Sequence, residues 1–159
     1  MRIALLLILS SLCAEAAEIQ TIRSPDKKAV ATILPASDES IVVFRDEENR
    51  TVCDQKFLSE DGEHGLSYLR GKWTPDSRFF VFTLTSSGGH SSWHFPAYAY
   101  DRFKNRILSL DRHYIKSVVD PEFRVLSPHI LQIKVIDLAK PEPSNGKWIR
   151  VDLEKLLKK

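Results

Sequence analysis

The sequence has 159 residues, of which 28% are charged, and its 23 Lys and Arg against 21 Asp and Glu give a formal net charge of +2. So weak a balance argues against a dedicated nucleic-acid surface, which would show a concentrated basic stripe. The length is enough for one domain with a sizeable hydrophobic core.

Residues 1–16 have the pattern of a secretory signal peptide. Arg2 supplies a short positive region, an apolar run of about ten residues follows over 3–12, and Ala14-Glu15-Ala16 provides the small residues of a cleavage site. The apolar run is too short to span a bilayer, which needs about 20 apolar residues. We therefore predict a mature chain that begins near Ala17, has no transmembrane span and is periplasmic or secreted.

Cys13 lies in the predicted signal, so Cys53 is the only cysteine of the predicted mature chain. A single cysteine cannot form an internal disulfide, and stability must then come from packing. Cys53 stands in the strand-like stretch RTVCDQKFL. We predict a buried, inert thiol that resists thiol reagents until the chain unfolds.

One kind of tripeptide recurs along the chain as Ser24-Pro25-Asp26, Thr74-Pro75-Asp76 and, in a degenerate copy, Ser127-Pro128-His129. The prolines are 50 and 53 residues apart, and a β-rich apolar run follows each tripeptide. Proline presets the first corner of a turn, and an Asp side chain bonds to backbone amides further on. The spacing predicts internal repeats near 18–63, 64–112 and 113–152, with Pro75 and Asp76 in a tight turn before a strand at 79–85.

A second pair of matching segments supports the repeat. Each of them reads as strand, polar turn and strand, and their alignment pairs Asn49-Arg50 with Asn105-Arg106. Asp26 and Asn49 are 23 residues apart, whereas Asp76 and Asn105 are 29 apart. The second repeat therefore has about six extra residues between its two central strands, within LTSSGGHSSWHFPAYAYD, residues 84–101.

The stretch RGKWTPDSRFFVFTLTSSGG contains Trp73, the Thr74-Pro75-Asp76 turn and the apolar run Phe80–Phe82. It resembles the repeat of TolB-type β-propellers, whose blades have a Trp-Ser-Pro-Asp-Gly-like turn before an apolar strand. Ser77 replaces the usual glycine, and Arg23 stands where the first repeat would have its tryptophan. The resemblance implies blades of about four antiparallel strands. It does not imply an activity, because propellers host unrelated functions.

We predict a single all-β domain over residues 17–159, with antiparallel propeller-like blades or an open β-sandwich of about 10–12 strands. Strands are predicted at 19–23, 29–34, 40–45 and 51–57, then at 67–73, 79–85, 95–101 and 107–110, and finally at 114–119, 130–137 and 148–151. The ending LEKLLKK predicts a short helix or a frayed tail. Since closed propellers usually have four to eight blades, a homodimer through open sheet edges is one way to complete the structure.

The longer connection at 84–101 is the candidate site. In a blade of this pattern it projects from the face opposite the Pro75–Asp76 turn, where propellers commonly bind ligands, and function concentrates in loops held by a rigid sheet. Aromatic area combined with polar tips is typical of binding loops. We predict a recognition loop from Gly88 to Phe95. Its predicted ligand contacts are His90, Ser91, Trp93 and His94, with Arg102 as a contact for an anionic group.

The predicted function is an exported binding or scaffold module that binds another envelope protein or a surface ligand, without nucleic acid and without a cofactor. The competing function is a metal-assisted hydrolase, because His90 and His94 have the spacing H-x3-H. That spacing has less meaning in a glycine-rich loop than on a helix. Serines are numerous near His90, but no Gly-x-Ser-x-Gly elbow occurs.

Overall fold

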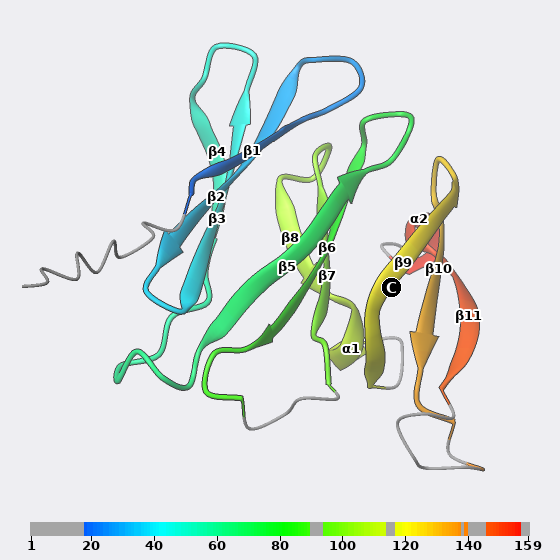
Figure 1. Ribbon diagram of the computed structural model, residues 1–159. Coiled ribbons are helices and arrows are strands. Elements are labelled where there is room, and N and C mark those ends of the chain that lie inside the picture. The colour runs from blue at the N-terminus through cyan, green and yellow to red at the C-terminus, as the bar shows by residue number, and fades with distance from the viewer. Residues whose placement is uncertain (1–17, 90–93, 114–116, 138, 140–145, 157–159) are drawn as a thin grey trace, which may run out of the picture.

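The computed structural model describes residues 18–89, 94–113, 117–137, 139 and 146–156, which form three antiparallel sheets (Figure 1). We name these sheets blade 1, blade 2 and blade 3. Blade 1 contains β1 (Gln20–Arg23), β2 (Ala29–Ala36), β3 (Glu39–Asp46) and β4 (Thr51–Lys56). Blade 2 contains β5 (Leu66–Trp73), β6 (Phe79–Ser86), β7 (Ala97–Asp101) and β8 (Arg106–Ser109). Blade 3 contains β9 (Val118–Ser127), β10 (Ile130–Val135) and β11 (Lys147–Asp152).

Neighbouring strands of each blade are also neighbours in the sequence, and blade 2 stands between the other two (Figure 1). Helix α1 (Leu110–His113) follows β8, and helix α2 (Leu153–Leu156) follows β11, so the short C-terminal helix is confirmed. The predicted all-β, antiparallel class is also confirmed, and the eleven strands among the described residues fall within the expected number. No helix in the described ranges is long and apolar enough to cross a membrane.

The eight strands of blades 1 and 2 lie close to their predicted positions, but the first strand of blade 3 does not. It was predicted at 114–119, whereas β9 runs over Val118–Ser127. The sequence did not predict this strand because it contains Pro121, and a proline within a strand is normally confined to sheet edges and bulges. The pairing of β9 with β10 is irregular between Phe123 and Val118, and Pro121 falls within that irregular stretch.

The first two tripeptides form the same turn. Ser24 Oγ accepts the amide of Ala29 at 3.0 Å and donates to Asp26 Oδ1 at 2.6 Å. Thr74 Oγ1 accepts the amide of Phe79 at 2.9 Å and donates to Asp76 Oδ1 at 2.5 Å. The tight turn predicted at Pro75 and Asp76 is therefore confirmed. The Thr74 hydroxyl connects this turn to β6, the strand that follows.

The third tripeptide forms a different turn. Strand β9 extends to Ser127 and β10 begins at Ile130, so that only Pro128 and His129 lie between the paired strands. Because position three of this copy is His129, it lacks the carboxylate that accepts the hydroxyl in the other two copies.

The residue after each Asp has a left-handed backbone, with φ of 62° at Lys27 and 63° at Ser77. A side chain in this conformation is strained by about 1 kcal/mol relative to glycine. Ser77 has a compensating contact, since its Oγ accepts the amide of Asp26 at 2.9 Å and so joins the turns of blades 1 and 2. The serine hydroxyl thus gains a contact between blades at a position whose left-handed backbone favours glycine.

Lys27→Gly is expected to raise the free energy of unfolding by about 0.5–1 kcal/mol, because it relieves the left-handed strain and the exposed Lys27 side chain adds little to stability. Ser77→Gly relieves the same strain but loses the bond to Asp26, so we expect it to give no such gain. Urea denaturation of both variants measures the difference. Equal stabilisation by the two substitutions would contradict the bridging role of Ser77.

Strand β6 is buried on both faces and supplies both cores. Phe80, Phe82 and Leu84 face an aromatic core between blades 1 and 2. Phe79 and Val81 face an aliphatic core between blades 2 and 3. A strand that is buried on both sides reads as a continuous apolar run, as FFVFTL does here. The blades therefore pack face to face as consecutive layers.

Cys53 lies on β4 and packs partly against the aromatic core, but it is half-buried, so the prediction of a fully buried thiol is corrected. Partial burial raises the pKa of the Cys53 thiol, with the nearby Asp54 charge acting in the same direction. The thiolate, which is the reactive form, is therefore disfavoured.

Candidate functional site

The antiparallel blades separate two ends of the molecule. The turns that open β2 and β6 lie at one end, which we call the turn end. The connections between β2 and β3 and between β6 and β7 lie at the other, which we call the loop end, at the bottom of Figure 1. The predicted loop Gly88–Phe95 belongs to the loop end. Gly88, Gly89, His94 and Phe95 are described, whereas His90, Ser91 and Trp93 lie outside the described residues.

The structure places Arg102 away from this loop. His94 precedes β7 and Arg102 follows it, so the strand of about 13 Å separates their positions. Arg102 Nη1 donates to Asp26 Oδ2 at 2.6 Å and joins blade 2 to the first turn of blade 1. Although partial burial opposes it, hydrogen bonds from Ser24 and Arg102 hold the pKa of Asp26 below its ordinary value. Arg102 thus has a structural ion pair and does not join the predicted loop contacts.

Both ends of the β6–β7 connection are fixed to neighbouring segments. On its first side, the amide of Ser87 donates to the carbonyl of Gly65 at 3.1 Å, and Ser87 Oγ donates to the carbonyl of Glu63 at 2.9 Å. On its second side, the amide of Phe95 donates to the carbonyl of Val118 at 2.9 Å. The loop therefore starts beside the β4–β5 connection and ends beside blade 3.

His94 pairs with Asp111 at the base of the loop. The distance from His94 Nε2 to Asp111 Oδ2 is 3.2 Å, and the amide of Ala97 also approaches Oδ2, at 3.4 Å. The Asp111 side chain is only 14% exposed, and its Oδ1 has no hydrogen-bond partner among the described residues. Burial raises the pKa of Asp111 to about 6, although the neighbouring His94 acts in the opposite direction. This pair was not predicted, because 17 residues separate its members and α1 positions Asp111.

Asp111→Asn is expected to make stability less dependent on pH. The folded pKa of about 6 lies above the unfolded value of about 3.9, so the wild-type carboxyl contributes stability at low pH that is lost as pH rises through this window. The variant should therefore gain stability relative to wild type between about pH 4 and 7, reaching about 2 kcal/mol. Urea denaturation across this range measures it, with Asp54→Asn, an exposed acid on β4, as the charge control. Parallel curves for Asp111→Asn and wild type would contradict the assignment.

The β4–β5 connection, residues 57–65, is held by a buried carboxylate. Glu39 is 3% exposed and accepts the amides of Gly65 at 2.7 Å and Ser59 at 2.9 Å, together with the Ser59 hydroxyl. The hydrogen bonds from Ser59 lower the pKa of Glu39. Sequence reasoning missed this anchor, since its only signal is an acidic residue at the start of an apolar strand.

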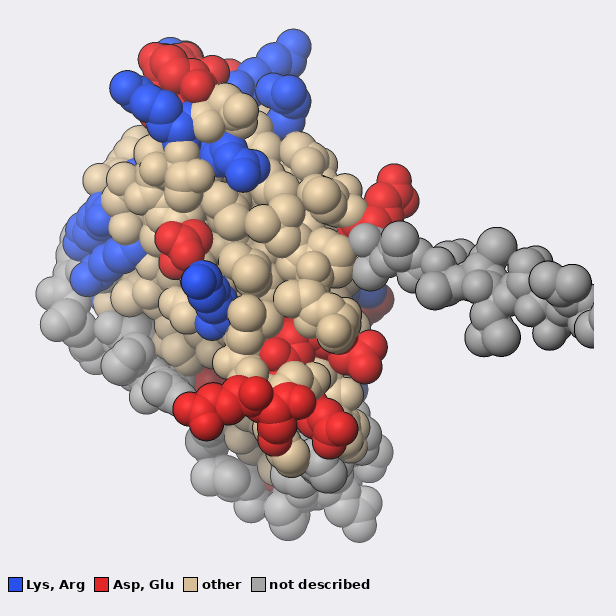
Figure 2. Space-filling model, turned by 90° about the vertical axis from the view of Figure 1, so that its left-hand side faces the viewer, with Lys and Arg blue, Asp and Glu red and all other residues tan. Residues whose placement is uncertain are grey.

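The loop end is acidic. Figure 2 shows red side chains gathered at the lower end of the molecule, over the β4–β5 connection. The exposed acids of this end are Asp38, Glu60, Asp61 and Glu63. Asp61 accepts the amide of Glu63 at 3.0 Å and pairs with His64, and these bonds lower the pKa of its carboxyl. The Asp61 carboxyl therefore remains ionised, and the loop end presents negative charge.

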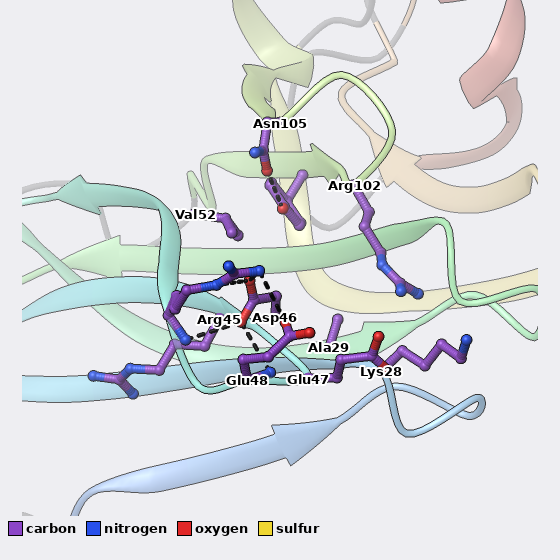
Figure 3. Close-up of a pocket in the computed structure, with 11 residues that line it drawn as sticks. Lys28, Ala29, Arg45, Asp46, Glu47, Glu48, Val52, Arg102 and Asn105 are labelled. Atoms are coloured by element: carbon purple, nitrogen blue, oxygen red, sulfur yellow. Dashed lines mark hydrogen bonds and ion pairs between the residues drawn. The ribbon is translucent and has the colours of Figure 1, made fainter.

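A pocket of about 310 Å³ lies at the turn end, between the β3–β4 and β7–β8 turns (Figure 3). Several charged side chains that line it form ion pairs with one another. Arg50 pairs with Asp46 at 2.7 Å and with Glu48 at 2.9 Å. Tyr100 donates to Asn105 Oδ1 at 2.6 Å, and burial raises the pKa of Tyr100 to about 12. The pocket is thus built around structural contacts of the turns.

The hydrolase alternative gains no support. Its second histidine, His94, pairs with Asp111, while His90 lies outside the described residues. Within the described ranges, no three His, Cys, Asp or Glu side chains gather as a metal site.

No family model and no curated protein matches the sequence. Among solved structures, 86% of the chain matches 37% of an uncharacterised protein from Listeria monocytogenes EGD-e, with a TM-score of 0.50 and 16% identity. The chain has a propeller-like fold. The same share of the chain matches 40% of the β-propeller domain of the Trilobed protease from Pyrococcus furiosus, at a TM-score of 0.49 and 13% identity. It also matches 42% of TolB from Acinetobacter baumannii, at a TM-score of 0.35 and 16% identity.

The chain thus spans about two fifths of the length of these three structures. At such low identities the likeness concerns the fold, and folds of this kind host unrelated functions. The features that bear on function are therefore the contacts and charges of the turn end and the loop end.

Proposed function

We propose that this protein is an exported, periplasmic binding module whose loop end recognises a basic surface on another envelope protein. The observation that supports this is the position of the β6–β7 connection, which is fixed on both sides and stands next to the acidic β4–β5 connection. A loop that is held at its base loses less conformational entropy on binding, which favours affinity.

The connection is also longer than its counterpart in blade 1. Only Ser37 and Asp38 separate β2 from β3, whereas ten residues separate β6 from β7. The additional residues include the proposed contacts His90, Ser91 and Trp93, and His94 follows them. Aromatic and imidazole side chains at such positions are suited to protein recognition.

The negative charge of the loop end determines which kind of partner would bind there. Carboxylates attract a cationic surface and speed its approach, whereas they repel the phosphates of nucleic acid. Binding should therefore weaken as salt is added, because these side chains are exposed and screened by ions. The proposed partner is a protein with a basic patch or an equivalent cationic ligand of the cell envelope.

Affinity capture from periplasmic extract tests the proposal. The bait, the protein from Ala17 onward, is compared with a His90→Ala, Trp93→Ala, His94→Ala variant and with an Asp38→Asn, Glu60→Gln, Glu63→Gln variant, both shown to be folded. We expect the first variant to lose the partner and the second to bind it with weaker salt dependence. Lys28→Ala and Glu47→Ala at the turn end serve as the control and should leave capture unchanged.

If all variants capture the partner equally, the proposal is contradicted. So would a partner lost only by the turn-end control, since the binding surface would then lie at the opposite end of the blades.

A further inference from the structure

Among the described residues, blade 3 has three strands where blades 1 and 2 each have four. In blades 1 and 2 the third strand is covered on its outer side by β4 or β8, and these two fourth strands lie against each other. In blade 3 the third strand is β11, and no described residue pairs with its outer edge. No described residue therefore occupies the position that a fourth strand takes in the other blades, and we call this side of β11 the open edge.

The backbone of β11 presents hydrogen-bonding groups to this open position. The amide of Leu153 donates to the carbonyl of His129 at 2.8 Å, which sets the alternation of the antiparallel pair. Counting back from Leu153, the N–H and C=O groups of Val151, Ile149 and Lys147 face β10. Those of Trp148, Arg150 and Asp152 face away from it, as a ladder ready for another strand.

The two faces of β11 differ in chemistry. Val151 is buried and Ile149 is half-buried against the core between blades 2 and 3. Trp148 and Arg150 are exposed on the opposite face, with Trp148 40% exposed and the Arg124 guanidinium 5.4 Å from its ring centroid. Arg150 and Arg124 bring positive charge to this face beside the open edge, and Asp152, the acid that follows Arg150 on the same face, pairs with Lys155.

Helix α2 leaves the edge uncovered. It follows β11 directly, but Leu153 and Leu156 pack into the core on the side of blade 2. An ion pair between Arg78 and Glu154 holds the helix to the opening turn of β6. The helix therefore lies over the end of the core and does not run along β11.

We propose that the open edge of β11 binds an extended segment of a partner protein, alternating aliphatic and acidic residues, as an antiparallel fourth strand of blade 3. This is strand addition, in which backbone hydrogen bonds provide affinity and alternate side chains provide specificity. The aliphatic side chains extend the core beside Ile149 and Val151 and meet Leu108 of β8, which is half-buried at that core. The acidic side chains lie next to Arg150, and the Arg124 guanidinium, which reaches from β9 to the Trp148 ring, adds positive charge to the same face.

Charge favours this occupant over a second copy that pairs with Arg150 opposite Arg150, whereas a second copy that pairs with Asp152 opposite Arg150 is an outcome of the test below. Two copies that pair through β11 about a two-fold axis bring two Arg150 and two Arg124 side chains to the same face of one sheet. Like charges on neighbouring strands destabilise pairing, whereas carboxylates opposite the arginines stabilise it. The proposal concerns an edge of blade 3 and is independent of the loop end.

A synthetic eight-residue peptide that alternates valine and glutamate is the probe, with binding to the purified protein followed by fluorescence anisotropy. In the proposed pairing, glutamate amides face β11 and valine amides face away from it. We therefore expect N-methylation of the glutamate amides to weaken binding at least tenfold and N-methylation of the valine amides to leave it nearly unchanged. A peptide that alternates valine and lysine should bind at least tenfold more weakly.

Arg150→Pro removes an outward amide and leaves the β10 ladder intact, because proline is tolerated at edge positions of this kind. It should abolish binding, whereas Arg150→Ala, which keeps the amide, should weaken binding only a few-fold. Far-UV circular dichroism checks the fold, and the N-methylated peptides decide the question if the proline variant unfolds. Equal binding of the two N-methylated peptides, or none of the parent peptide, overturns the proposal. A dimer of the protein that Arg150→Pro converts to a monomer also overturns it, in favour of a second copy.

Discussion

Phe44→Ala is expected to lower the free energy of unfolding by about 3–5 kcal/mol, the range for truncating a fully buried phenylalanine. Phe44 is completely buried at the centre of the core between blades 1 and 2. Its ring stacks on Tyr100 with centroids 3.8 Å apart and meets Trp73 and Phe80 edge-on at 6.2 and 5.7 Å. Truncation therefore removes three aromatic contacts and leaves a cavity between two blades.

Equilibrium urea denaturation of both proteins measures the loss through the shift of the midpoint. Phe103→Ala is the matched control, since Phe103 is 74% exposed on the β7–β8 turn and contacts Arg78 only through a ring–guanidinium interaction. We expect less than about 0.5 kcal/mol from the control. Similar losses for Phe44→Ala and Phe103→Ala would mean that blades 1 and 2 do not depend on this core.

The same aromatic core fixes the position of the turn end relative to the loop end. Strands β3, β6 and β7 run through it, and each has a turn-end and a loop-end terminus. Because β6 and β7 pair within blade 2 and pack face to face against β3, the ion pair of Arg102 with Asp26 and the pair of His94 with Asp111 are held at opposite ends of β7.

The strands of blades 1 and 2 could be predicted because local chemistry decides them. Alternating or continuous apolar runs are flanked by turns whose Ser or Thr, Pro and Asp carry out defined hydrogen-bonding roles, as Ser24 and Thr74 show. Strand β9 could not be predicted, since Pro121 lies within it and only the pairing with β10 accommodates the irregularity. Tertiary pairing overrides local propensity here.

The candidate site was predictable only as a loop. Sequence spacing located the longer β6–β7 connection, but its anchors come from distant segments. Glu39 binds the amide of Gly65 across 26 residues, and Arg102 reaches Asp26 across 76. No periodicity in a single sequence records such pairs, because they depend on how the blades are stacked. For this reason the sequence gives no sign of the Arg102–Asp26 ion pair or of the Glu39 anchor.

Gly65→Ala is the second substitution with a large expected effect, a destabilisation of about 1–3 kcal/mol through overpacking. Gly65 is buried where the β4–β5 connection meets Glu39, and its amide donates to Glu39 Oε1 at 2.7 Å. An added Cβ would clash with the Glu39 carboxyl group and with the backbone carbonyl oxygen of Phe57. The carbonyl cannot move away easily, because the amide of Leu66 donates to it at 2.8 Å.

Gly62→Ala separates this clash from the general effect of replacing a glycine. Gly62 has a φ of 74° with open space around it, so alanine there has a backbone strain of about 1 kcal/mol and no contact to displace. Gly65→Ala should exceed this value in urea denaturation and should also weaken partner capture, because Ser87 of the proposed recognition loop donates to the Gly65 carbonyl. If Gly65→Ala were no more destabilising than Gly62→Ala, the connection would be loosely held. The acidic residues at the loop end would then lack the fixed positions that charge recognition requires.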